Sequence, residues 1–98
     1  MSVLVNFAIF PTDKGTSISP YVARVERAIR ALGFQSQLGP MSTVVETETM
    51  AEALRVLQAS YDALAEDCTR VYCTATFDIK QSPMGRMQAK VKSVESKI

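Results

Sequence analysis

Residues 39–48 read Gly-Pro-Met-Ser-Thr-Val-Val-Glu-Thr-Glu, a turn that leads into a strand. Gly-Pro is a strong turn signal, and the β-branched run at positions 43–45 suits a pleated sheet. Because side chains alternate along a strand, Ser42, Glu46 and Glu48 share one of its faces. Hydroxyls and carboxylates therefore interrupt an apolar strand, and we expect a polar ligand to be bound here.

The segments on either side of this strand predict an alternation of strands and helices. Serine followed by proline marks a helix start at Ser19 and again at Ser82, with the serine as N-cap. Thr49 and Glu52 have the spacing of a capping box. In chain order, the predicted elements are a strand at 3–10, a helix at 19–33, strands at 34–38 and 42–48, a helix from 49 to about 66, a strand at 70–80 and a last helix after Pro83.

Each predicted helix has an apolar stripe at helical spacing, which we expect to be buried. The stripes are Val22, Val25, Ile29 and Leu32 in the first helix, Leu54, Leu57, Tyr61 and Leu64 in the second, and Met87, Val91, Val94 and Ile98 in the third. Glu26 and the arginines at positions 24, 27 and 30 are expected on the more exposed sides of the first helix.

The order β-α-β-β-α-β plus a helix predicts a single α+β domain over residues 1–98 with a ferredoxin-like fold. Two helices then cover one face of an antiparallel sheet in strand order 4-1-3-2, and an extra helix follows at the C-terminus. The other sheet face would carry Leu4, Ala8, Phe10 and Tyr72 around Asn6. Such a face is too apolar to stay wholly in water, so we expect another subunit or the last helix to cover it.

Composition argues against several classes of protein. The net charge is +1, from 11 basic and 10 acidic residues, which gives no electrostatic reason to expect nucleic acid or an anionic membrane as a partner. No apolar run approaches the roughly 20 residues of a membrane helix. The chain has no histidine, the usual general base and commonest metal ligand. Cys68 and Cys73 match no zinc or redox motif, and we expect reduced thiols in a cytoplasmic protein.

Four stretches resemble the small thiamine-binding protein family. They are residues 3–11 (Val-Leu-Val-Asn-Phe-Ala-Ile-Phe-Pro), 17–23 (Ser-Ile-Ser-Pro-Tyr-Val-Ala), 39–46 (Gly-Pro-Met-Ser-Thr-Val-Val-Glu) and 90–97 (Lys-Val-Lys-Ser-Val-Glu-Ser-Lys). The resemblance covers nearly the whole chain. It implies a ferredoxin-like domain that assembles as a homo-oligomer, a dimer or tetramer, and binds thiamine or its hydroxymethylpyrimidine moiety without catalysis and without a cofactor.

The resemblance is closest at Thr43 and Glu46, and next at the serine-rich helix start that contains Ser19. An aminopyrimidine needs a carboxylate for its exocyclic amine, hydroxyls or amides for its ring nitrogens, and an apolar side chain over its face. The predicted ligand-binding residues that supply these groups are Thr43, Glu46, Ser42, Met41, Asn6, Ser19 and Phe10.

Each of these residues also has a plainer explanation. Glu46 suits a solvated strand position, Thr43 has high strand propensity, and Ser19 suits an N-cap. Asn6 either serves neighbouring backbone or contacts a ligand, and Met41 and Phe10 suit a core or a subunit interface. A regulatory or protein-interaction module that uses the open sheet face therefore remains the alternative. An enzyme is less favoured, although carboxylates alone can act as acid and base.

Overall fold

The computed structural model describes residues 1–98 and contains three helices and one four-stranded sheet. The elements are β1 (Ser2–Pro11), α1 (Ser19–Ala31), β2 (Gln35–Leu38), β3 (Thr43–Thr47), α2 (Met50–Ala65), β4 (Val71–Lys80) and α3 (Arg86–Glu95). All neighbouring strands are antiparallel, in the order β2-β3-β1-β4. The predicted ferredoxin-like α+β fold, its strand order and its C-terminal helix are therefore confirmed.

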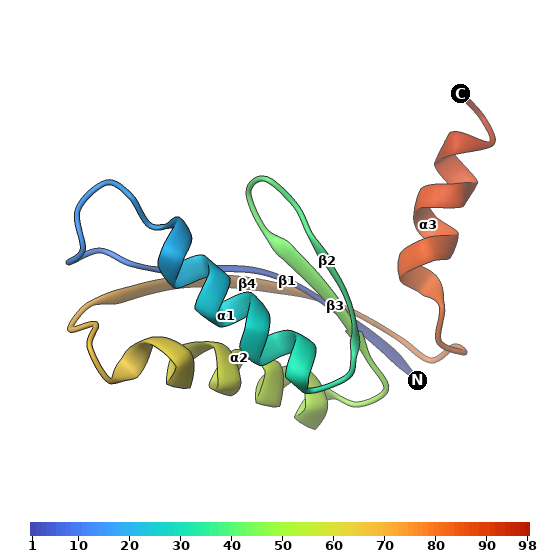
Figure 1. Ribbon diagram of the computed structural model, residues 1–98. Helices are drawn as coiled ribbons and strands as arrows, with labels where there is room; N and C mark the ends of the chain where they lie inside the picture. Colours follow the sequence, from blue (N-terminus) through green and yellow to red (C-terminus); the bar gives the residue numbers. More distant parts are fainter.

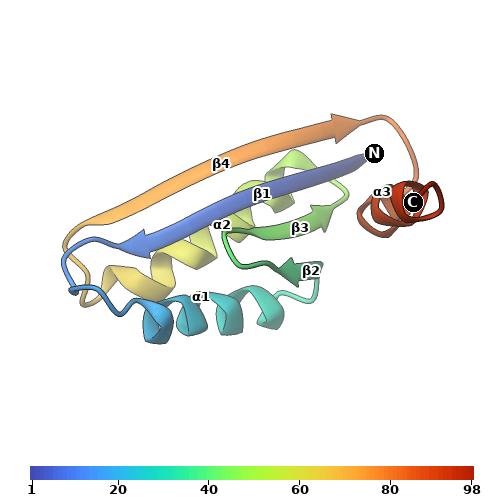
Figure 2. The same ribbon diagram turned by 90° about the horizontal axis from the view of Figure 1, so that it is seen from above.

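The helices lie on different sides of the sheet. α1 and α2 run side by side against one face, and α3 projects from the end of the sheet where the N-terminus lies (Figures 1 and 2). None of the three helices is long and apolar enough to cross a membrane. The face opposite α1 and α2 is covered by α3 only at that end.

The core lies between the sheet and the first two helices. Alternation along β1 directs every second side chain toward the helices. The neighbouring strand β3 and the two helices supply most of the other side chains of the core. The buried apolar residues are Val3, Val5, Phe7, Ile9, Val25, Ile29, Val45, Ala53, Val56, Leu64 and Cys68. The other face of β1 is buried only in part, because Leu4 is buried there whereas Asn6 is exposed.

Two predicted stripes differ from the observed ones. In α2 the buried side is Ala53, Val56, Ser60 and Leu64, and the predicted members Leu54 and Tyr61 are exposed. The helix is thus rotated from the expected orientation, with the small side chains of Ala53 and Ser60 on its buried side. In α3 only Met87 is buried, since the helix projects from the sheet instead of lying along it.

Two predicted serine caps are wrong. The N-cap of α1 is Ile18, and Ser19 and Pro20 are its first two helical residues. The N-cap of α3 is Gly85, whose φ of 100° lies in the left-handed region open to glycine. By contrast, the capping box of Thr49 at the start of α2 is confirmed in both of its hydrogen bonds.

The sheet is uneven in width, and this shapes one cleft. β1 pairs with β3 only from Val3 to Phe7, but it pairs with β4 as far as Pro11. Beyond Phe7, the side of β1 that faces β3 has no strand neighbour. The chain between Leu38 and Thr43 turns at this point, so a hollow forms beside the free edge of β1.

Candidate functional site

The hollow is a cleft of about 220 Å³ between three elements. Its walls are the end of β1 (Phe7–Phe10), the first half of α1 from Ile18 to Glu26, and the β2–β3 turn (Leu38–Thr43). We call it the hairpin cleft. Most of its lining is apolar, with a few polar groups that converge on one side, which is the usual composition of a small-molecule site.

The central polar group of the hairpin cleft is the carboxylate of Glu26. Glu26 is only 8% exposed, and the Thr43 hydroxyl donates a hydrogen bond of 3.0 Å to its Oε2. Its other oxygen, Oε1, accepts no hydrogen bond from the protein, yet no fully enclosed polar side-chain atom lacks a partner. Oε1 is therefore not fully enclosed, and it belongs to a carboxylate that Thr43 holds in place.

Four of the predicted ligand-binding residues line the hairpin cleft. They are Phe10, Met41, Ser42 and Thr43. Thr43 is buried and directed toward α1, whereas Met41 at the tip of the turn is 88% exposed. Gly39 closes the turn, because its N–H donates 2.8 Å to the carbonyl of Ser42. The cleft thus combines a hydroxyl, a carboxylate and two large apolar side chains.

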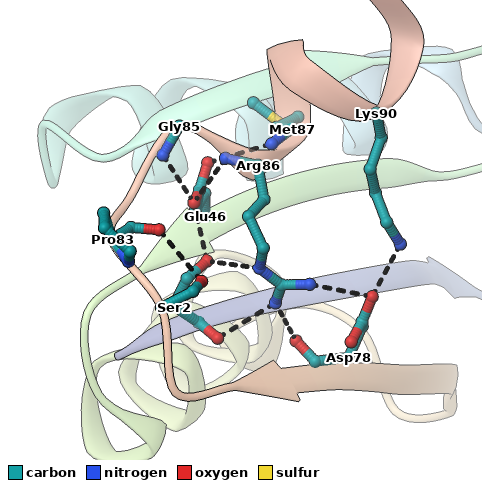
Figure 3. Close-up of polar contacts among 9 residues, drawn as sticks. Ser2, Glu46, Asp78, Pro83, Gly85, Arg86, Met87 and Lys90 are labelled. Carbon is teal, nitrogen blue, oxygen red and sulfur yellow. Dashed lines mark hydrogen bonds and ion pairs between the residues drawn. The ribbon is translucent and has the colours of Figure 1, made fainter. Parts of the chain in front are cut away.

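Glu46 lies elsewhere, on the opposite face of the sheet and under the start of α3 (Figure 3). It is 1% exposed. Its Oε2 accepts hydrogen bonds from the Ser2 hydroxyl at 2.6 Å and from the backbone N–H groups of Gly85 and Arg86 at 2.9 and 3.1 Å. Its Oε1 accepts from the N–H of Met87 at 3.2 Å. Both oxygens are thus engaged by the chain itself.

These bonds make Glu46 the cap of α3, supplied from another part of the chain. The first N–H groups of a helix lack partners within the helix and attract negative charge. Burial by itself would raise the pKa of Glu46, but the bonds from Ser2 and from the N–H groups of Met87, Arg86 and Gly85 outweigh burial and lower the pKa below its ordinary value. Glu46 is therefore held as a carboxylate.

Arg86 extends this attachment across the ends of β1 and β4. Its Nε donates to the Ser2 hydroxyl at 3.0 Å, and its Nη2 donates to the carbonyls of Ser2 and Asp78 (Figure 3). The carboxylate of Asp78 lies 3.0 Å from Arg86 and 2.6 Å from Lys90. The hydrogen bonds from Lys90 and Arg86 lower the pKa of Asp78. We call Ser2, Glu46, Asp78, Arg86 and Lys90 the α3 clamp.

The remaining two predicted residues line two other clefts. Asn6 is exposed on the open sheet face, in a cleft of about 330 Å³ beside Met87 and Lys90. Ser19 lies in a groove of about 380 Å³ that follows α1 along the edge of β2. The structure thus brings together four of the seven predicted residues and separates Glu46, Asn6 and Ser19 from them.

The prediction that Glu26 lies on a more exposed side of the first helix is wrong, because Glu26 is buried. Val22, Val25 and Ile29 define the inward side of α1, and position 26 lies on the same side at helical spacing. A carboxylate within an inward stripe needs a partner, and Thr43 is that partner. Nowhere do three or more histidine, cysteine or acidic side chains form a group that could hold a metal ion.

Comparison with known proteins was informative over nearly the full chain. A family model described as thiamine-binding protein matches residues 5–95. A UPF0045 protein of Mycobacterium bovis is 34% identical over 95 residues, which cover 97% of this chain and 93% of that protein. A UPF0045 protein of Methanothermobacter thermautotrophicus is 31% identical over 84 residues and covers 85% of each chain.

Solved structures show the same fold. A hypothetical protein from Methanocaldococcus jannaschii superposes with a TM-score of 0.82 at 24% identity, over 96% of each chain. A protein from Thermotoga maritima, named as a candidate thiamine biosynthesis or salvage protein, superposes with a TM-score of 0.79 at 19% identity, over 95% of this chain and 99% of that one.

Proposed function

Because this chain belongs to the thiamine-binding protein family, we propose that it binds the hydroxymethylpyrimidine moiety of thiamine in the hairpin cleft, without turnover. The observation that carries the proposal is the Glu26 carboxylate on the wall of an apolar cleft, whose Oε1 accepts no hydrogen bond from the protein. An exocyclic amine on a flat ring is a donor that this oxygen can accept. Thr43 holds the carboxylate in place through the bond to Oε2.

The other groups of the hairpin cleft suit the rest of such a ring. Phe10 and Met41 are available to cover its faces, and Ser42 offers a hydroxyl at the turn. The free edge of β1 past Phe7 adds main-chain donors and acceptors for ring nitrogens. At about 220 Å³ the cleft is smaller than the ~300–1,000 Å³ of sites for drug-sized ligands. Its size therefore favours one substituted ring over the two linked rings of thiamine.

Calorimetric titration with hydroxymethylpyrimidine and with thiamine tests the proposal. We expect saturable binding near one ligand per chain, with Glu26→Gln about tenfold weaker or worse, because a hydrogen bond to a charged group is lost. Glu48→Gln is the matched control, since Glu48 is an exposed carboxylate outside the cleft. Ligand recovered unchanged after long incubation would support binding without turnover.

The same titration separates the two carboxylates. Glu46→Gln should leave the affinity unchanged, because Glu46 lies under α3 and outside the hairpin cleft. Loss of binding in a Glu46→Gln variant that is still folded by circular dichroism, but not in Glu26→Gln, would place the ligand at α3 instead. Absence of binding by either ligand to the folded wild type would overturn the proposed function.

We also propose that the chain assembles as a homo-oligomer through its open sheet face. Phe10 and Tyr72 pack on this face with ring centroids 5.8 Å apart, and Tyr72 is exposed. Val91 and Val94 of α3 are exposed as well. Such an apolar surface favours a contact between copies. Tyr72→Asp with Val94→Asp should lower the mass measured by light scattering, and an unchanged mass would exclude this interface.

We propose a cytoplasmic location on the basis of the cysteines. Both are free, and Cys73 is exposed. Unpaired exposed thiols persist in a reducing compartment. Cell fractionation followed by detection of the chain tests this, and recovery outside the cytoplasmic fraction would contradict it.

A further inference from the structure

The hairpin cleft adjoins the groove along α1. Val22, Glu26 and Leu38 line both spaces, so Glu26 lies at their junction. The groove has Arg27 and Arg30 on its other side. A ligand in the hairpin cleft that extends past Glu26 would therefore meet two guanidinium groups.

These two guanidinium groups are not neutralised within the chain. The three ion pairs of the protein involve Arg24, Arg86 and Lys90 as the cations. Arg30 lies one helical turn from Glu26 and would ordinarily pair with it on the helix surface. Glu26 is instead bonded to Thr43 in the interior, which leaves Arg27 and Arg30 exposed and without acidic partners.

The spacing of these charges describes a ligand. Glu26 and Arg30 are four residues apart, so their backbone positions are separated by roughly 6 Å along the helix axis and their side chains lie on the same side of the helix. A ring amine and a phosphate attached through one methylene to the neighbouring ring atom have a comparable separation. Arginine binds phosphate oxygens through two parallel hydrogen bonds, which makes it the side chain suited to such a group.

We infer that the site prefers the phosphate monoester of the aminopyrimidine over the free alcohol, with the ring amine at Glu26 and the phosphate at Arg27 and Arg30. The inference rests on the proposed function. It adds that the ligand is an anion at one end, which the apolar hairpin cleft by itself would not select. The difference in affinity between the free alcohol and the phosphate monoester would then come only from the contacts of the phosphate with the two arginines of the groove.

Calorimetry with hydroxymethylpyrimidine and with its phosphate monoester tests the inference. On the wild type we expect the monoester to bind about fivefold to tenfold more tightly, and the difference to shrink at high salt because the arginines are exposed. The double variant Arg27→Gln with Arg30→Gln should abolish this difference and keep the affinity for the free alcohol. Arg55→Gln with Arg70→Gln is the control, because it removes the same charge from exposed positions outside the groove.

The outcomes separate the two proposals. If the alcohol binds and the monoester binds no better, the inference is overturned and the proposed function stands. If the control lowers the affinity for the monoester as much as the groove variant does, net charge explains the difference and the inference is overturned. If neither compound binds, both proposals are overturned.

Discussion

Replacement of Glu46 by glutamine should loosen α3 and destabilise the protein. The carboxylate accepts four hydrogen bonds, three on Oε2 and one on Oε1. Glutamine keeps one acceptor oxygen. Its amide group would then point a donor at a backbone N–H, whichever way the side chain is turned.

The magnitude follows from those four bonds. A hydrogen bond to a charged group contributes about 1.5–3 kcal/mol, against about 0.5–1.5 kcal/mol for a neutral pair, and a buried donor without a partner costs about 1–3 kcal/mol. Three weakened bonds at about 1–1.5 kcal/mol each, with one donor left without a partner at about 1–3 kcal/mol, set an upper range of about 4–7.5 kcal/mol. Detachment of α3 lets water reach the freed N–H groups, because Met87 is the only buried residue of that helix. We therefore expect the free energy of unfolding to fall by about 2–4 kcal/mol.

Urea denaturation followed by circular dichroism at pH 7 measures this change, and hydrogen exchange of the α3 amides reports whether the helix detaches. Glu48→Gln is the control, since the Glu48 side chain is exposed and accepts no hydrogen bond. A Glu46→Gln variant with the wild-type urea midpoint and wild-type protection of α3 would refute the assignment of Glu46 as the cap of that helix.

The same reasoning predicts a pH dependence with a definite sign. The pKa of Glu46 is lowered in the folded protein from an ordinary value of 4.5. A lowered folded pKa stabilises the fold above the ordinary value, and this contribution is lost as the pH falls through the folded pKa. The difference in stability between the wild type and Glu46→Gln should therefore be full near pH 7 and shrink progressively below about pH 4.5.

Three further substitutions test other parts of the structure. Thr49→Ala should lower the free energy of unfolding by about 1 kcal/mol in urea titrations, because the N–H of Glu52 loses its acceptor. Leu64→Ala should lower it by about 2–5 kcal/mol, since it leaves a cavity at a fully buried position, and a smaller loss would mean that α2 packs differently. Gly39→Ala should weaken ligand binding in calorimetry, because the new Cβ would lie 2.9 Å from the carbonyl oxygen of Ser42 and the turn must shift. An unchanged affinity would show that the turn does not contribute to the ligand site.

Much of the fold could be predicted because its signals are local. The alternation in β1 and the capping box at Thr49 act within a few residues of the chain, and the structure contains both. The two predicted serine caps failed for a physical reason, although α1 does begin at Ser19 as predicted. A proline sets the backbone near a helix start, but the first residue of the helix is decided by where its N–H groups find acceptors. For α3 the acceptor is Glu46, 39 residues before Gly85.

The candidate site could be predicted only in part. Met41, Ser42 and Thr43, predicted as ligand-binding residues from the local signals of Gly-Pro and the β-branched run, line the hairpin cleft. The role of each carboxylate could not be predicted from the strand. Glu46 has the same sequence context whether α3 packs over it or leaves it in water.

The sequence alone thus determined the order of the elements, the fold class and the family, because periodicity and capping depend on neighbours along the chain. Only the tertiary structure decided which acidic side chain faces the cleft and which one holds α3. Glu26 meets Thr43 across 17 residues, and Glu46 meets Met87 across 41. Contacts over such separations form when helices pack on a sheet, and their partners depend on the rotation of each helix and the length of each strand.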